Sequence, residues 1–156
     1  MDDCLLIFLF FCFIIIIIDN INSIKLISIE GYDELKLDNQ LNIYGEPLQI
    51  CGMDPITGWK RDGYCNTNNN DHGTHTVCAR VNDEFLDYTT SKGNDLITPI
   101  GSFTGLRDGD NWCLCALRYK QAIYDNKQPP IFLDSTNEKT LKYLDIEDLE
   151  NNSIKK

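Results

Sequence analysis

The chain has 156 residues, enough for one domain of ordinary size with a single hydrophobic core. Its content of 42% hydrophobic and 24% charged residues is typical of soluble globular proteins, and its formal net charge is -10. This acidic balance argues against nucleic acid as a partner, because phosphate backbones attract Lys/Arg-rich surfaces, and the densest basic groups here are the dipeptides Lys60-Arg61 and Lys155-Lys156.

The first 23 residues predict a hydrophobic leader. Residues 4–18 form an uncharged apolar run, shorter than the ~20 residues that a membrane-spanning helix needs. Ser23 offers a small residue for cleavage, whereas the acidic start Asp2-Asp3 replaces the usual basic one. A cleaved signal peptide places the protein in the secretory pathway or outside the cell. A retained segment would anchor it to the membrane, which is a partner only in that case.

The remaining chain is divided into a spacer at residues 24–41, one domain at 42–149 and a polar tail at 150–156. Residues 51–74 are rich in Gly, Asn and Asp and predict a long ordered loop region. Residues 76–81 alternate between apolar and polar side chains, which predicts a half-buried strand. Asn82 then caps a helix that Gly93 ends.

The C-terminal third predicts further short elements. Residues 112–126 fit either one helix or a strand that turns into a helix, with helix favoured from Leu114 onward. Residues 131–133 predict a short strand, Ser135 to Glu138 a capping box that opens a helix, and residues 145–149 a last helical turn. Interleaved strands and helices without a Gly-rich phosphate loop predict a small two-layer α+β domain with long ordered loops and no nucleotide cofactor.

Three sequence blocks together resemble a known family. They are Cys51-Gly52-Met53-Asp54-Pro55, Asp71-His72-Gly73-Thr74-His75-Thr76-Val77-Cys78-Ala79 and Gly109-Asp110-Asn111-Trp112-Cys113-Leu114-Cys115-Ala116-Leu117-Arg118-Tyr119-Lys120. These blocks resemble the domain-of-unknown-function 2237 family, small proteins of bacteria and some eukaryotes without an assigned activity. The resemblance implies domain boundaries and a fold but no reaction. Bacterial members typically lack a leader, which implies a fold that does not require an oxidising compartment.

Five cysteines lie beyond the leader: Cys51, Cys65, Cys78, Cys113 and Cys115. An odd number allows at most two disulfides and one free thiol, and the pairing stays open. Reduced thiols buried around Trp112 are the default interpretation, with disulfides and metal or thiol chemistry as alternatives. The spacing is poor for zinc, because Cys113 and Cys115 are one residue apart and the others are far from their neighbours, so no metal is predicted.

His75 and Cys78 form the obvious candidate for a Cys/His nucleophile pair. On a strand, residues three positions apart face opposite sides, which argues against this pair; on a helix the conclusion would be reversed.

A binding pocket is expected where the loop from Cys51 to His75 meets residues 93–95 and the turn before Trp112, because sites tend to form on ordered loops. The candidate pocket residues are Asp54, Arg61, Asp62, Asp71, His75, Asn94, Asp95, Asp110 and Trp112. The structural alternative assigns the acidic residues to turns and Trp112 to the core.

These observations favour a small binding or accessory domain for an unknown small molecule or protein. An enzyme with a Cys/His- or zinc-centred site is the alternative from another class, and a structural or protein-interaction module is a further one.

Overall fold

The computed structural model describes residues 40–155. The expected leader and nearly all of the expected spacer lie outside the described residues. Within residues 40–155, none of the helices has the length and apolar character needed to cross a membrane.

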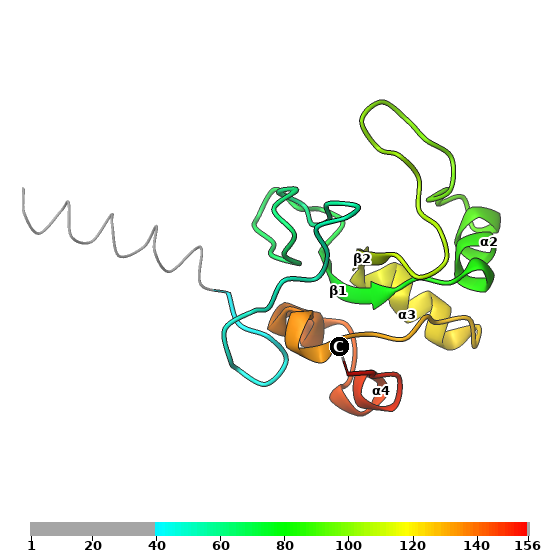
Figure 1. The fold of residues 1–156 in the computed structure, drawn as a ribbon. Coiled ribbons are helices and arrows are strands. Elements are labelled where there is room, and N and C mark those ends of the chain that lie inside the picture. The colour runs from blue at the N-terminus through cyan, green and yellow to red at the C-terminus, as the bar shows by residue number, and fades with distance from the viewer. Residues whose placement is uncertain (1–39, 156) are drawn as a thin grey trace, which may run out of the picture. The chain divides into compact units, whose positions relative to one another are not determined.

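The described chain forms a small α+β domain, as expected (Figure 1). Its elements are β1 (His75–Arg80), α2 (Asp83–Ser91), β2 (Asn111–Cys115), α3 (Ala116–Tyr124), 3-10 turns at Leu133–Ser135 and Glu138–Lys142, and α4 (Ile146–Asn151). The predicted loop region at residues 51–74 contains no helix or strand, as its turn-forming composition indicates.

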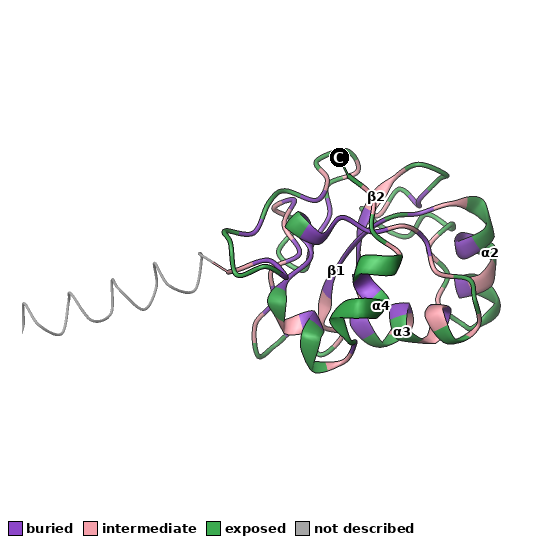
Figure 2. Ribbon diagram, turned by 90° about the horizontal axis from the view of Figure 1, so that it is seen from below, coloured by how far each residue is buried: buried purple, intermediate pink, exposed green. Residues whose placement is uncertain are grey.

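Strands β1 and β2 form an antiparallel pair whose two faces have different neighbours. Ala79 lies opposite Trp112 and Val77 opposite Leu114, and this face joins the main core with residues of α2, α3 and α4. Cys78 lies opposite Cys113 on the other face. Figure 2 shows buried residues along the strands and on the inward sides of the helices.

Strand β1 is therefore buried on both faces, and the prediction of a half-buried strand was wrong. Its residues from Thr76 to Ala79 are all buried. The face that was expected to be exposed is covered, because Cys78 packs among other cysteines and Phe132. The alternation of residues along the strand does not predict these contacts.

Helix α2 begins and ends as predicted. The Asn82 side chain accepts a hydrogen bond from the Phe85 N–H, and Gly93 follows the helix in a left-handed conformation, with φ +80°. Gly93 fits there because it has no Cβ to clash in that conformation.

The segment after Gly109 is a strand and then a helix, with the change at Ala116 rather than at Leu114. Pairing with β1 extends the strand to Cys115, a tertiary contact that overrides the helical periodicity.

Two expectations near the C-terminus need correction. At residues 131–133 only Ile131 pairs, in isolated bridges with Ala79 and Ser153, because a 3-10 turn starts at Leu133. The predicted capping box at Ser135 is not used: the Ser135 hydroxyl donates to the Ile50 carbonyl, and the following turn is capped by Asn137, whose side chain accepts from the Lys139 N–H.

Candidate functional site

A cavity of about 440 Å³ lies over β2, between two loops. One wall comes from the loop at residues 51–74 and the other from the loop at residues 92–110, which joins α2 to β2; both loops extend away from the sheet in Figure 1. The lining residues are Gly58, Trp59, Arg61, His75, Asp95, Leu96, Ile100, Phe103, Trp112 and Cys113. Loop residues and the start of both strands therefore build this site together.

Trp112 forms the floor where the two walls meet. Its side chain is 7% exposed, and its ring packs against Phe103, with 5.4 Å between ring centroids. The Arg61 guanidinium carbon lies 4.7 Å from the Trp112 ring centroid, a cation–π contact. Trp112 is thus both a core residue and part of the cavity wall.

The Arg61 charge is not neutralised by an ion pair within residues 40–155; its guanidinium donates only a long hydrogen bond, 3.5 Å, to the Gly58 carbonyl. The Arg61 backbone N–H also donates to the Gly58 carbonyl, so this residue belongs to a turn that starts at Gly58. An unneutralised guanidinium at a cavity wall is suited to receive an anionic group.

His75 is held at the cavity by the buried carboxylate of Asp71. The distance from His75 Nδ1 to Asp71 Oδ1 is 2.6 Å, and the Asp71 side chain is fully buried. Asp71 Oδ2 accepts from both the His75 N–H and the Thr67 hydroxyl, each at 2.8 Å. Burial alone raises the pKa of the Asp71 carboxyl, but the hydrogen bonds from His75 and Thr67 outweigh it, so this pKa lies below its usual value.

The imidazole of His75 is also fixed in orientation. It stacks against Trp59, with ring centroids 6.2 Å apart and planes 10° from parallel. Gly73 lies so close that a Cβ there would clash with the imidazole ring. Because Nδ1 is bound by Asp71, Nε2 is the nitrogen left to interact with a ligand.

A second hollow of about 490 Å³ adjoins the first and shares Arg61, Phe103 and Trp112 with it. Asp54 lines this second hollow, together with neighbouring residues of its turn.

The structure brings four of the nine candidate pocket residues to one cavity: Arg61, His75, Asp95 and Trp112. Asp71 acts behind them through His75. Asp95 also stabilises a turn, because its side chain accepts hydrogen bonds from the Thr98 and Ile97 N–H groups. Hydrogen bonds from Thr98 and Ile97 hold the pKa of the Asp95 carboxyl below its usual value.

Three other candidates do not line either hollow. Asp62 accepts hydrogen bonds from the Tyr64 N–H and the Asn66 side chain. Asn94 donates to the Thr89 hydroxyl, and Asp110 accepts from the Arg107 N–H. These contacts stabilise turns and a helix end.

Sequence reasoning missed the apolar part of the cavity: Trp59, Leu96, Ile100 and Phe103. One signal was present, because Trp59 stands next to Gly58 in a polar, turn-rich segment where a large aromatic side chain has little local packing to join.

Four of the cysteines form disulfides, Cys51–Cys78 and Cys65–Cys113, and Cys115 is free. The default expectation of reduced thiols was therefore wrong for these four, whereas the limit of two bridges and one free thiol is met. The cysteine pairs fit an oxidising, secreted environment.

The Cys/His nucleophile pair of His75 and Cys78 is not formed, because Cys78 is bonded to Cys51. The free Cys115 is the cross-strand partner of His75 in the backbone register, beside a bulge in β1. Their side chains are not hydrogen-bonded to each other within the described range.

The fold and the cavity define a small disulfide-bonded α+β domain whose site is built from two loops and residues of both strands. The sequence model of the family described as "Uncharacterized protein conserved in bacteria (DUF2237)" matches residues 41–153, and the chain belongs to this family. No curated protein matches the chain. The family description assigns no reaction, so any function must be inferred from the site.

Proposed function

We propose that this domain binds a small organic anion with a planar, apolar body in the cavity between the two loops. The observation that carries this proposal is the combination of one unneutralised guanidinium, Arg61, with the aromatic walls Trp59, Phe103 and Trp112. The volume of about 440 Å³ is within the range of small-molecule pockets.

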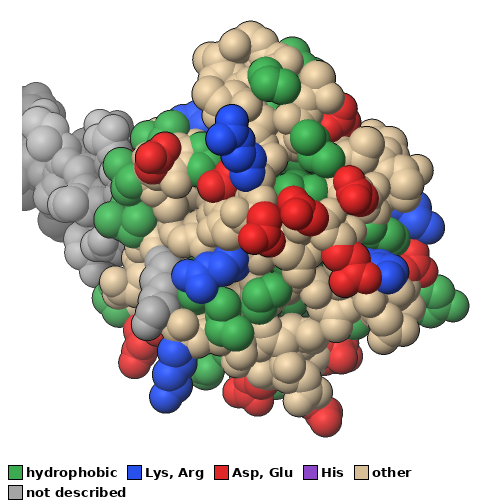
Figure 3. Space-filling model, turned by 45° about the vertical axis from the view of Figure 1, so that its right-hand side comes forward, with side chains coloured by type: hydrophobic (Ala, Val, Ile, Leu, Met, Phe, Trp, Pro, Cys, Tyr) green, Lys and Arg blue, Asp and Glu red, His purple; other side chains and the backbone are tan. Residues whose placement is uncertain are grey.

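The apolar walls would bind the body of the ligand. Trp59 and Ile100 are 43% and 69% exposed, so a ligand covering them would remove apolar surface from water. Figure 3 shows hydrophobic side chains lying among acidic and basic ones on one face of the molecule. Aromatic side chains give such contacts a preference for planar ligands, because rings stack with offset or edge-to-face geometry.

The polar groups would set the orientation of the ligand. Arg61 offers several N–H donors to a carboxylate or a similar planar anion, and His75 offers Nε2. Asp95 lines the same cavity and would repel the anionic end. The anionic group is therefore expected on the Arg61 side.

A hydrolytic or transfer enzyme is a second candidate, which the Asp71–His75 pair favours. A buried carboxylate that orients an imidazole is the arrangement of a general base. The lining residues of the first cavity offer His75 no free thiol or hydroxyl nucleophile, because Cys113 is bonded to Cys65. Binding without chemical change of the ligand is the better supported function.

Intrinsic fluorescence provides the test, because the chain has only two tryptophans, Trp59 and Trp112, and both line the cavity. Titration of the full chain with benzoate should change the emission saturably, and the neutral isostere benzamide should bind at least about tenfold more weakly, since it loses the charge-assisted pair with Arg61. Recovery of unchanged benzoate would separate binding from catalysis.

A pair of neighbouring variants gives the control. Arg61→Asn removes the charge and tolerates the left-handed backbone at this position, φ +56°, while Lys60→Asn removes one charge from a residue that lines neither hollow. Arg61→Asn should weaken benzoate binding and Lys60→Asn should not. Equal binding of benzoate and benzamide, or equal effects of the two variants, would refute the proposal and leave the interaction-module alternative.

We also propose that residues 1–23 direct the chain into the secretory pathway and are removed near Ser23. The two disulfides support this proposal, because such bonds persist in oxidising compartments. Intact mass of the protein from its native host tests it: a mass that includes residues 1–18 would show a retained segment, and carbonate extraction would then test for an anchor.

A further inference from the structure

The cysteine-bearing face of the sheet holds a compact group of four sulfur atoms. Cys51, Cys65, Cys78 and Cys113 are each at most 2% exposed and pack together with Phe132. Two of them come from the strands and two from the loop at residues 51–74. The group is therefore a cross-link between this loop and the sheet.

Cys78 and Cys113 are direct partners in the β1–β2 register. Their backbone N–H groups do not bond across the strands: Cys78 donates to the Thr136 hydroxyl and Cys113 to the Thr57 hydroxyl. They form a non-hydrogen-bonded pair, the type in which side chains of an antiparallel sheet come closest. Each sulfur nonetheless bonds to a loop cysteine rather than across the strands.

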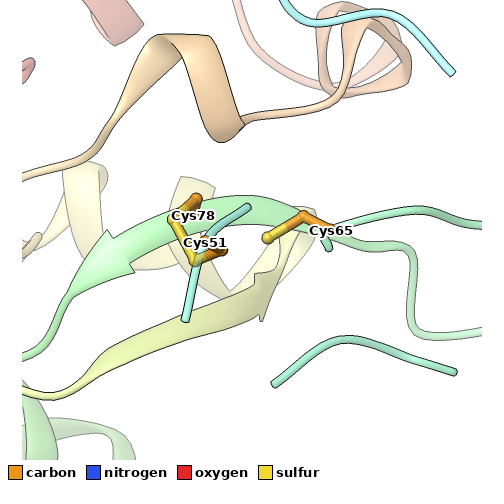
Figure 4. A group of neighbouring side chains, drawn as sticks. All are labelled: Cys51, Cys65 and Cys78. Atoms are coloured by element: carbon orange, nitrogen blue, oxygen red, sulfur yellow. A yellow bond between two sulfur atoms is a disulfide. The ribbon is translucent and has the colours of Figure 1, made fainter. Parts of the chain in front are cut away.

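The two bridges are also in contact range of each other. The Sγ atoms of Cys51, Cys65 and Cys78 all lie within 4.8 Å of one another. Figure 4 shows the Cys65 side chain pointing toward the bond between Cys51 and Cys78. The fourth sulfur, of Cys113, is bonded to that of Cys65. The four sulfurs thus form one group on this face of the sheet, in which Cys113 is linked to the other three through Cys65.

We propose that, once both bridges are reduced, these four cysteines form a tetrahedral site for a zinc ion. In a Cys4 zinc site the Zn–S distance of about 2.3 Å places neighbouring sulfurs about 3.8 Å apart. The Cys65 Sγ already lies within 4.8 Å of the Cys51 and Cys78 sulfurs, and side-chain rotation after both bonds open would bring all four sulfurs to this spacing. The sequence spacing is poor for zinc because these four cysteines are far apart along the chain, but the fold brings them into one cluster.

Zinc can bind these sulfurs only after both disulfides are reduced. A phosphine reductant breaks each S–S bond, and with one water molecule it yields two thiols and one phosphine oxide per bridge. Zinc then displaces the thiol protons and binds the four thiolates, so affinity should rise with pH. No other oxidant or reductant takes part.

Such a site would keep the loop attached to the sheet in a reducing environment. Cys113 lines the cavity next to Trp112, and Cys65 is in the same loop as Trp59 and Arg61. Either cross-link, two disulfides or one zinc ion, would hold the loop at residues 51–74 in place as a wall of the cavity.

Cobalt(II) tests the proposal, because its visible spectrum reports tetrahedral thiolate coordination. The full chain is reduced with a phosphine, which does not compete for metal as dithiols do, and titrated with Co²⁺ and then Zn²⁺. We expect one Co²⁺ per reduced chain with the tetrahedral thiolate spectrum, displacement by Zn²⁺, and no binding to the oxidised chain. Where reduction unfolds the chain, zinc should restore the near-ultraviolet dichroism of its aromatic side chains.

Variants distinguish this site from adventitious binding. Cys65→Ser should weaken binding more than about 100-fold, since even outer-shell changes cost 10- to 100-fold. Cys115→Ser is the matched control, because it removes the one free thiol found in residues 40–155 and leaves the four ligands. Absence of binding to the reduced chain, or equal binding by the Cys65→Ser and Cys115→Ser variants, would overturn the proposal.

Discussion

The two loops that form the cavity are held in different ways. The loop at residues 51–74 is joined to the strands by both disulfides and contains buried polar residues, among them Thr57, Thr67 and Asp71. The loop at residues 92–110 contains no cysteine, and its tip at Ile100 is 69% exposed.

The hydrogen bonds at the tip of this second loop are local. Ile100 and Phe103 bond to each other, and the Leu106 N–H donates to the Leu96 carbonyl. The loop at residues 51–74, the tied wall, is therefore linked covalently to the strands. The loop at residues 92–110, the open wall, is held without covalent links, by packing of Leu96, Phe103 and Leu106 on the core. In the proposed function, the tied wall supplies Arg61 for the anionic group, and the open wall supplies Asp95 and apolar lining residues such as Ile100.

Trp112 contacts both walls, through Arg61 and Phe103, and its removal should have the largest effect on stability. Trp112→Ala is expected to lower the free energy of unfolding by roughly 3 to 5 kcal/mol, because it leaves a large cavity in the core. Urea denaturation followed by circular dichroism measures this loss. A folded variant that loses less than about 1 kcal/mol would show that the walls support themselves.

Removal of either disulfide should lower the free energy of unfolding, because it removes one of the two covalent links between the tied wall and the strands. Loop-closure entropy predicts a loss of about 4 kcal/mol for Cys65→Ala with Cys113→Ala, which opens a separation of 48 residues. The same reasoning gives about 3.5 kcal/mol for Cys51→Ala with Cys78→Ala, a separation of 27.

Hydrogen exchange of residues 51–74 should accelerate in both double variants, and Cys115→Ala is the control that leaves both bridges intact. Unchanged exchange would mean that buried hydrogen bonds alone hold this wall.

The Asp71–His75 pair tests the polar anchoring of the tied wall. Asp71→Asn should cost about 1 to 3 kcal/mol, because it weakens a buried network of three hydrogen bonds. The folded-state pKa of Asp71 is below the usual 3.8, so its contribution to stability is present above that value and is lost as pH falls through the folded pKa. Unfolding measured from pH 2 to 7 should therefore show a weaker acid dependence in the variant; equal slopes would contradict this.

The smallest stability effect is expected in the open wall. Ile100→Ser should change the free energy of unfolding by less than about 0.5 kcal/mol, since the side chain is already exposed. It should nevertheless weaken benzoate binding, because Ile100 lines the cavity. The exposed Leu117 on α3 gives the matched control, Leu117→Ser, which should leave binding unchanged. Equal binding by both variants would exclude the open wall from ligand contact.

Local sequence signals were sufficient for helix α2 and for the loop at residues 51–74. The Asn82 cap, the Gly93 stop and the concentration of Gly, Asn and Asp act within a few residues, so the sequence alone determines them. The same local signals placed Arg61, His75, Asp95 and Trp112 near one another in prediction, because all four belong to turn-rich segments or flank them.

Only the tertiary structure decided how distant segments meet. Pairing with β1 made Cys115 the end of a strand, although its periodicity also fits a helix. The pairing of the cysteines, the partnership of Asp71 with His75 and the apolar lining from Leu96 to Phe103 depend on how the chain closes loops of many residues. Spacing along the chain does not encode these contacts, because they are selected by burial and packing in the folded domain.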